Sequence, residues 1–251
     1  MTSLPDLVLF DLDGTLVDPA GAITGGIGRA LQARGLPVPN QRVLDAMVGP
    51  PLGESLRFLA RVPEAEVPEV IRLYRADYRA AGMAASHVYP GIVPLLEDLK
   101  GRGTLLAVVT QKPTPIAVEL LKVQGLAGYF GSIHGAALDD VEGAGGPDSG
   151  KIPILAEALE HYAGRFGRAV MIGDRHYDIE AATHHGIEAV GVGWGFAANG
   201  ELAAAGATTV AASADELHAR LRAPGGEDGK DNGSMDTSMD TAEENAGHGT
   251  L

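Results

Sequence analysis

The sequence predicts an α/β fold in which a doubly wound parallel sheet carries an inserted all-helical domain. Short apolar runs bounded by turn residues alternate along the chain with longer segments of helical periodicity, which is the pattern of strands and crossover helices. The alternation is interrupted once, between Pro19 and about His87, where apolar residues recur only at helical spacing. A chain of 251 residues has room for one such core and a smaller insertion.

Five apolar runs have the length and composition of buried parallel strands. They are Leu7 to Phe10, Leu105 to Val109, Ala169 to Ile172, Ala189 to Val192 and, more weakly, Thr208 to Ala211. The segments between them predict helices at Ile92 to Lys100, Pro115 to Gln124, Ile152 to Tyr162, Ile179 to His185 and Ala214 to Leu221. Strands that alternate with helices in this way indicate a Rossmann-like core.

The helical insertion leaves the core after the first strand and returns at Tyr89-Pro90-Gly91. Its pattern is shown by Leu52, Leu56 and Leu59, which share one face of a helix. Because two connections join the two parts, we expect a hinge between them. The predicted division is a catalytic core of residues 1–17 and 89–222 and a helical cap of residues 18–88.

The last 29 residues, 223–251, differ in composition from the rest of the chain. They are rich in Gly, Asp, Ser, Thr and Asn, and they carry seven acidic residues against Lys230, so they contribute −6 of the formal charge of −14. This stretch lacks the apolar surface that would offset the entropy lost on ordering. We therefore expect a disordered acidic tail.

Composition also limits the partners and the compartment. The net charge of −14 argues against nucleic acid or an anionic membrane as a partner, because both require clustered Lys and Arg. The chain has no cysteine, which permits a reducing compartment. Met1 to Asp6 has no basic residue and no long apolar run. We expect a cytoplasmic protein that is a monomer or a homodimer.

The strongest chemical signal is the segment Asp11-Leu12-Asp13-Gly14-Thr15, which directly follows the first predicted strand. Ligands of open α/β sheets bind at the carboxyl ends of the strands, so Asp11 and Asp13 lie where chemistry is expected. The alternative interpretation is an ordinary turn, because Asp-Gly pairs are common between elements.

Three further polar segments follow later strands. Thr110-Gln111-Lys112 offers a hydroxyl and a helix N-terminus, Ser149-Gly150-Lys151 opens the next helix with a cation, and Gly173-Asp174 to Asp178 supplies two more carboxylates. Each has an ordinary interpretation as a helix cap or a solvated charge. Capping alone does not explain the order of acid pair, hydroxyl, lysine and acid pair on successive strand ends.

These four segments resemble the four motifs of the haloacid dehalogenase-like hydrolase superfamily, over roughly residues 5–222. The helical insertion is similar to the cap of its phosphoglycolate phosphatase and 5′-nucleotidase-like branch. The segments Met171 to Arg175 and Gly193-Trp194-Gly195 look somewhat more like the nucleotidase-like members. Two departures from the commonest family form are Gln111, where Ser or Asn is more usual, and the Gly-rich loop Glu142 to Gly150.

The resemblance implies a phosphatase that forms an aspartyl-phosphate intermediate on Asp11. Asp13 would be the general acid and base. Thr110 would bind a phosphoryl oxygen, and Lys151 would stabilise negative charge on the nucleophile and the phosphoryl group. Within the same pattern, Mg²⁺ would be held by the Asp11 side chain, the Asp13 carbonyl, Asp174 and, as a ligand or a support, Asp178.

A divalent cation is also expected from electrostatics. With Asp11, Asp13, Asp174 and Asp178 ionised, Lys151 alone leaves the site with a charge of about −3, which would repel a phosphate dianion. Ligands that are all oxygen favour Mg²⁺ over zinc. The Asp13 carboxyl also favours an oxyanion leaving group, since family members that release halide lack this second acid.

Two alternatives to a phosphatase for phosphoglycolate or a nucleoside monophosphate remain open. The first is a phosphosugar mutase resembling β-phosphoglucomutase, although relatives of that kind usually have another residue at the position of Thr15. The second is an inactive phosphate-binding module, which would be expected to have lost at least one of Asp11, Asp13, Lys151 and Asp174, and all four are present.

Overall fold

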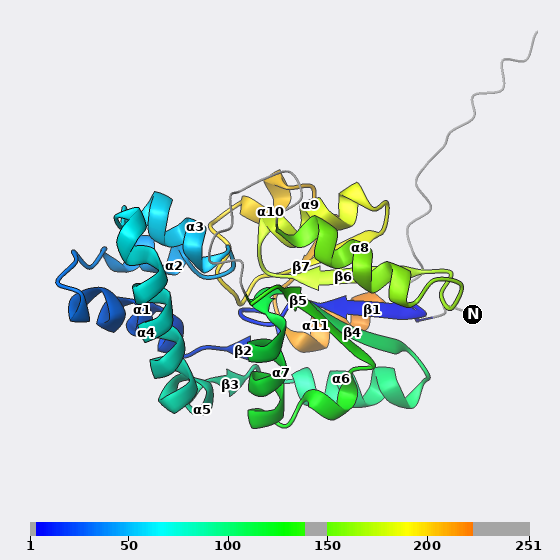
Figure 1. Cartoon of the computed structure of the whole chain (residues 1–251). Coiled ribbons are helices and arrows are strands. Elements are labelled where there is room, and N and C mark those ends of the chain that lie inside the picture. Colours follow the sequence, from blue (N-terminus) through cyan, green and yellow to red (C-terminus); the bar gives the residue numbers. More distant parts are fainter. Residues whose placement is uncertain (1–3, 139–149, 223–251) are drawn as a thin grey trace, which may run out of the picture.

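A computed structural model describes residues 4–138 and 150–222 of the chain (Figure 1). The tail, residues 223–251, and all but the last residue of the Gly-rich loop 142–150 lie outside this description, so the disorder expected of the tail stays a prediction. Within the described residues, the chain forms a six-stranded sheet with helices on both faces. A helical region lies beside the carboxyl ends of the strands.

The sheet is entirely parallel and has the strand order β5-β4-β1-β6-β7-β8. The predicted α/β fold class with a doubly wound sheet is therefore confirmed. β1 lies at the centre, where Leu7 pairs with Leu105 on one side and Ala169 on the other. The strands are β1 (Leu7–Phe10), β4 (Leu105–Pro113), β5 (Ser132–Ala136), β6 (Ala169–Gly173), β7 (Glu188–Val192) and β8 (Thr209–Ala211).

Successive side chains of a strand point to opposite faces of the sheet, and β1 shows this directly. Val8 and Phe10 join the apolar cluster covered by α6, α7 and α11, whereas Leu7 and Leu9 join the cluster covered by α8, α9 and α10 (Figure 1). Because all four residues are buried, the strand reads as a continuous apolar run. The helices are α6 (Ile92–Gly101), α7 (Thr114–Val123), α8 (Lys151–His161), α9 (His176–His184), α10 (Glu201–Ala204) and α11 (Ala214–Leu221), with the short turn η4 (Ala127–Tyr129).

The helical region, residues 19–86, is called the insert below because it interrupts the sheet between β1 and β4. Its apolar side chains belong to the same cluster as Phe10 of β1, so the insert packs on the core without a break. The elements are α1 (Ala22–Ala33), α2 (Gln41–Ala46), α3 (Leu52–Glu54), α4 (Val67–Asp77) and α5 (Met83–Ala85), with the short helical turns η1 (Ser55–Leu59), η2 (Glu64–Glu66) and η3 (Tyr78–Gly82).

Three strands were not expected from the sequence: β5 at the edge of the sheet and two short strands outside it. β2 (Val17–Asp18) and β3 (His87–Val88) pair antiparallel and hold together the two chain segments that lead into and out of the insert. Strands of two residues are too short to produce a recognisable alternation of apolar and polar residues. The predicted domain limits at 17/18 and 88/89 fall on this ribbon and stay a prediction.

Candidate active site

The predicted site residues all lie at the carboxyl ends of the strands or at the start of the following helix. Parallel strands bring these ends to one edge of the sheet, and β4, β1 and β6 are neighbours there. Asp13 is partly buried, and the other five residues are buried. The six are Asp11 and Asp13 after β1, Thr110 in β4, Lys151 at the start of α8, Asp174 after β6 and Asp178 in the first turn of α9.

Lys151 bridges two of the predicted carboxylates. Its Nζ atom lies 2.5 Å from Oδ1 of Asp11 and 2.8 Å from Oδ1 of Asp178. Burial alone would lower the pKa of this lysine, but the charges of Asp11 and Asp178 outweigh it and raise the pKa. The ammonium form is therefore maintained, and one cation joins the end of β1 to the start of α9.

Three buried carboxylates form a group with the geometry of a cation site. Asp11, Asp174 and Asp178 each offer an oxygen, and the three oxygens lie within 4.8 Å of one another. Burial and the neighbouring acids raise the pKa of Asp174 well above its usual value, and burial raises that of Asp178 to about 6 despite Lys151. The cluster is thus short of positive charge, and its hard oxygen donors match Mg²⁺.

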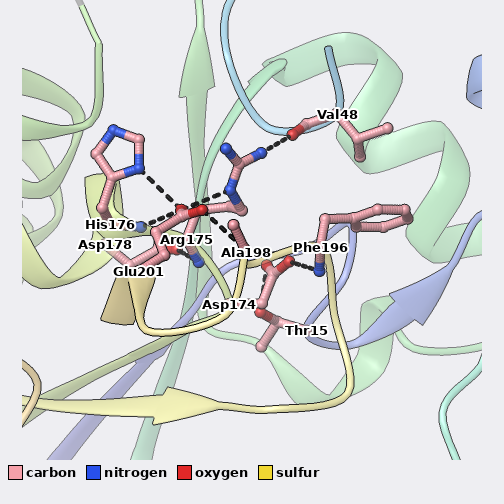
Figure 2. A network of polar contacts seen from close by, with 9 residues as sticks. All are labelled: Thr15, Val48, Asp174, Arg175, His176, Asp178, Phe196, Ala198 and Glu201. Carbon is pink, nitrogen blue, oxygen red and sulfur yellow. Dashed lines mark hydrogen bonds and ion pairs between the residues drawn. The ribbon is translucent and has the colours of Figure 1, made fainter. Parts of the chain in front are cut away.

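Asp174 is held by two donors from separate loops (Figure 2). The Thr15 hydroxyl donates to Oδ1 at 3.1 Å, and the Phe196 amide donates to Oδ2 at 2.8 Å. A Cβ atom at Gly14 or Gly195 would lie 2.2 or 2.3 Å from Oδ2 of Asp174. Glycine at both positions therefore lets the two loops close around this carboxylate.

The structure pairs Asp13 with Lys112, a residue to which sequence reasoning gave no role. Nζ of Lys112 lies 2.8 Å from Oδ2 of Asp13 and 4.5 Å from the ring centre of Tyr78, which belongs to the insert. Burial raises the pKa of Asp13, and Lys112 partly offsets this increase. Burial would lower the pKa of Lys112, but Asp13 reverses the shift and raises it.

Lys112 also changes the expected charge of the site. Four carboxylates and two ammonium groups give a formal charge of about −2 when all are ionised, instead of the −3 expected with Lys151 alone. The nearby Thr110 accepts a hydrogen bond from the Lys112 amide at 3.2 Å, and its hydroxyl hydrogen remains available as a donor. One sequence feature could have pointed to Lys112 as a site residue. It lies two residues after Thr110, in the strand β4 that continues to Pro113.

Comparison with known proteins identifies the family. The profile of the haloacid dehalogenase-like hydrolases matches residues 8–192, which is most of the chain and includes every predicted site residue. The chain belongs to the haloacid dehalogenase-like hydrolase family. The resemblance noted from the four sequence motifs is thereby confirmed.

The relatives of this chain are named for different activities. The chain is 41% identical over 219 residues to the tyrosine-protein kinase PtkA of Mycobacterium tuberculosis, covering 86% of this chain and 72% of PtkA. It is 35% identical to a 5′-nucleotidase of Pseudomonas aeruginosa, covering 78% of this chain and 86% of the relative. It is 34% identical to a phosphoglycolate phosphatase of Agrobacterium fabrum, covering 78% and 84%.

The fold of this family member is likewise shared with solved structures. The crystal structure of a predicted phosphatase from Clostridium acetobutylicum superposes with a TM-score of 0.76 at 37% identity, covering 87% of this chain and 99% of the other. As a haloacid dehalogenase-like hydrolase with relatives named as phosphatases, the chain is a phosphoric monoester hydrolase. None of the helices in residues 4–138 and 150–222 has the length and apolarity that crossing a membrane requires.

Proposed function

We propose that this protein is a Mg²⁺-dependent phosphatase that hydrolyses a small phosphomonoester through an aspartyl-phosphate on Asp11. The observation that carries the proposal is the Lys151 ammonium, which contacts both Asp11 and Asp178 inside a buried group of three carboxylates. A structural ion pair needs one carboxylate for one lysine. A site with surplus buried acids suits a ligand that brings positive charge and a phosphoryl group together.

Asp11 is the proposed nucleophile. One of its carboxylate oxygens attacks phosphorus, a new oxygen–phosphorus bond forms, and the bond from phosphorus to the leaving oxygen breaks. Lys151 lies against Asp11 and can hold the negative charge that spreads over the transferring group. Thr110 contributes its hydroxyl hydrogen to a phosphoryl oxygen. Water then attacks the acyl phosphate, which releases inorganic phosphate and restores the Asp11 carboxylate.

Asp13 is the proposed general acid and base. Lys112 holds its Oδ2 atom, while Oδ1 is buried and has no hydrogen-bond partner among the described residues. A buried carboxyl oxygen without a partner is costly, so a role toward a substrate atom accounts for it. In its protonated form Asp13 gives its proton to the leaving oxygen, and as a carboxylate it takes a proton from the attacking water.

The residues present fit a magnesium ion. We propose that Asp11, Asp174 and Asp178 hold it with their side chains, directly or through water, and Asp13 with its backbone carbonyl. When bound, the ion would supply charge neutralisation for the acids and the phosphoryl oxygens. Thr15 and the Phe196 amide orient Asp174 for this role, as supporting hydrogen bonds do for other metal ligands.

Phosphoglycolate and nucleoside monophosphates are the proposed substrates. Relatives at 34% and 35% identity carry the names of a phosphoglycolate phosphatase and a 5′-nucleotidase. The insert packs beside the strand ends and reaches Lys112 through Tyr78, so it is positioned to contact the leaving group. We therefore propose that the insert is the cap that selects the substrate.

A second candidate function follows from the relative at 41% identity. PtkA is named a tyrosine-protein kinase, and the chain covers 72% of its length. The same nucleophile and lysine could pass the phosphoryl group to a tyrosine hydroxyl instead of water. Label transferred from a phosphoryl donor to a protein tyrosine would favour this candidate.

A screen of purified protein tests the proposal. Phosphoglycolate, nucleoside monophosphates, β-glucose 1-phosphate and p-nitrophenyl phosphate are supplied with Mg²⁺ or with a chelator, and inorganic phosphate is measured. In ¹⁸O-water, attack of water on the phosphorus of the acyl phosphate should place label in the released phosphate, and the Asp11 carboxylate should stay unlabelled. Failure to release phosphate from any ester, or full activity with the chelator, would reject the proposal. Glucose 6-phosphate formed without free phosphate would favour the mutase.

A further inference from the structure

The insert contacts the metal-binding edge of the core through a buried arginine. Arg175 directly follows Asp174 and is 8% exposed. Its Nη1 atom donates to the carbonyl oxygen of Val48 in the insert at 2.5 Å, and its Nε atom donates to Oε1 of Glu201 at 2.8 Å (Figure 2). One guanidinium group therefore joins residues that lie 127 and 26 positions away in the chain.

Glu201 provides a fixed counter-charge on the core side of this contact. Its carboxylate also accepts hydrogen bonds from the His176 amide at 3.0 Å and the Ala198 amide at 2.9 Å. Burial raises the pKa of Glu201, but the hydrogen bonds from Arg175, His176 and Ala198 outweigh it and lower the pKa. Glu201 thus remains ionised and keeps the Arg175 charge compensated within the core.

This arrangement makes the bond to Val48 reversible. If the insert moves away, Arg175 loses one carbonyl acceptor but keeps its ion pair with Glu201, so no unpaired buried charge is left behind. A charge-assisted hydrogen bond to a carbonyl is strong enough to shift the population of two states and weak enough to break during a catalytic cycle.

The part of the insert that meets Arg175 is the loop between α2 and α3. This loop, residues 47–51, is called the 47–51 loop below. Gly49 has a φ of +107°, and a Cβ atom there would lie 3.3 Å from Cγ and 3.4 Å from Nη1 of Arg175. This φ favours glycine and the contact would be tight, so Gly49 lets the backbone present the Val48 carbonyl to the guanidinium.

Arg175 also acts on the proposed catalytic groups through its own backbone. Its amide donates to Oδ2 of Asp178 at 3.1 Å, and Oδ1 of Asp178 lies 2.8 Å from Nζ of Lys151. The backbone of Arg175 thus holds a carboxylate of the site while its side chain holds the insert.

A second ion pair between insert and core, Arg79 with Glu119, is different. Both side chains are solvent-exposed, at 42% and 45%, so the pair is screened by water.

We propose that Arg175 is a positioning residue that holds the insert closed beside the proposed metal-binding segment 173–178, by binding the 47–51 loop only when the insert is closed. Its catalytic consequence rests on the proposed phosphatase function. Its structural consequence, the position of the 47–51 loop, does not.

The test compares Arg175→Met, Arg175→Lys and the control Arg79→Gln, each in the full chain. Hydrogen exchange is followed in a peptide spanning residues 44–56. Loss of a charge-assisted hydrogen bond should speed exchange there by about tenfold to hundredfold in Arg175→Met. Lysine cannot make both bonds at once, so Arg175→Lys should show a smaller increase, and Arg79→Gln should match the wild type.

Kinetics and metal binding distinguish coupling from a merely structural role. In Arg175→Met, kcat/KM should fall, because catalysis needs the closed insert, whereas exchange reports the open fraction, and in Arg79→Gln it should stay at the wild-type value. Titration of the single tryptophan, Trp194, with Mg²⁺ should give a midpoint within about twofold of the wild type, since the Arg175 backbone is retained. An inactive wild type would reject the proposed function and leave the exchange measurement valid.

Unchanged exchange in residues 44–56 of a folded Arg175→Met protein would overturn the proposal. If that variant does not fold, unchanged exchange in Arg175→Lys overturns it equally. Equal acceleration in Arg79→Gln would also contradict it, because any loss of contact between insert and core would then suffice.

Discussion

Ion pairs occur in two contrasting surroundings in this protein. At the carboxyl ends of the strands, Lys151 and Asp178 are 3% and 1% exposed, whereas Arg72 and Glu69 on α4 of the insert are 64% and 38% exposed. The nitrogen–oxygen distances are nearly equal, 2.8 and 2.6 Å. The two ion pairs thus have similar geometry, but only the pair on α4 is in contact with solvent.

The difference shows which ion pairs contribute most to the free energy of unfolding. An exposed pair exchanges protein contacts for contacts with water, so its loss changes little. A buried pair has lost its water, and removal of one partner leaves a charge that the surroundings cannot solvate. The strand-end site also holds more acids than lysines, which is the feature that a bound cation and a phosphoryl group would satisfy.

The largest expected effect is that of Asp11→Asn. The amide is not a nucleophile, so kcat should fall by at least about 10⁴-fold. The fold should survive, because Lys151 keeps its contact with Asp178 and the variant removes one of the crowded negative charges. Phosphate release and the denaturant midpoint of the purified variant check both parts. Wild-type activity in a pure sample would reject Asp11 as the nucleophile.

Lys112→Met should produce the next largest effect. Asp13 would lose its counter-charge in a buried position, so the free energy of unfolding should fall by about 3 kcal/mol. The kcat value should fall by about 10–100-fold, because an unpaired Asp13 is held less well as acid and base. Lys112→Arg keeps the charge and should lose less in both measurements. If Lys112→Met matches the wild type in urea unfolding and in kcat, the Asp13–Lys112 pair has no role.

Much of the core was predictable from the sequence because its signals are local. A central parallel strand buried on both faces must be apolar at every position, and Leu7 to Phe10 therefore stands out. β5 could not be recognised in the same way. Residues Ser132 to Ala136 lie at the edge of the sheet and are only half-buried, which allows Ser, His and Gly in the strand. The approximate ends of β1 and β6 were enough to bring the predicted acids to one edge of the sheet, and the predicted helix start at α8 adds Lys151.

The partners of the site residues were not predictable, because they depend on contacts between distant segments. Lys112 pairs with Asp13 from the neighbouring strand end and lies over Tyr78 of the insert, and no spacing rule links these three residues. Arg175 reaches Val48 through a loop whose shape depends on Gly49. Sequence patterns report which face of an element is buried, whereas these contacts depend on how the insert sits on the core.

Removal of metal should reveal the surplus of buried acids as a pH dependence of stability. Asp178 has a pKa of about 6 in the folded protein, above its usual 3.8, so the folded state binds its proton more tightly than the unfolded state. This contribution to stability is complete below pH 3.8 and is lost as the pH rises through about 6.

Without metal, therefore, the free energy of unfolding should fall between pH 5 and pH 7.5, and Mg²⁺ should reverse the fall by binding the folded state. Urea titrations at several pH values, with a chelator or with Mg²⁺, measure it. Asp178→Asn should flatten the metal-free profile. A profile that is flat in the wild type with chelator would show that the acids are not forced to ionise together.

The smallest expected effect is that of Arg72→Ala on the outer surface of α4. Arg72 and Glu69 lie three residues apart on α4, and both are exposed to water. The stability lost with this ion pair should be nearly compensated by the higher helix propensity of alanine. The urea midpoint should stay within the error of the measurement, and kcat/KM should stay within about twofold. A loss approaching that of Lys112→Met would break the comparison, because it would show that a solvated charge on the insert contributes as much as a buried one beside Asp13.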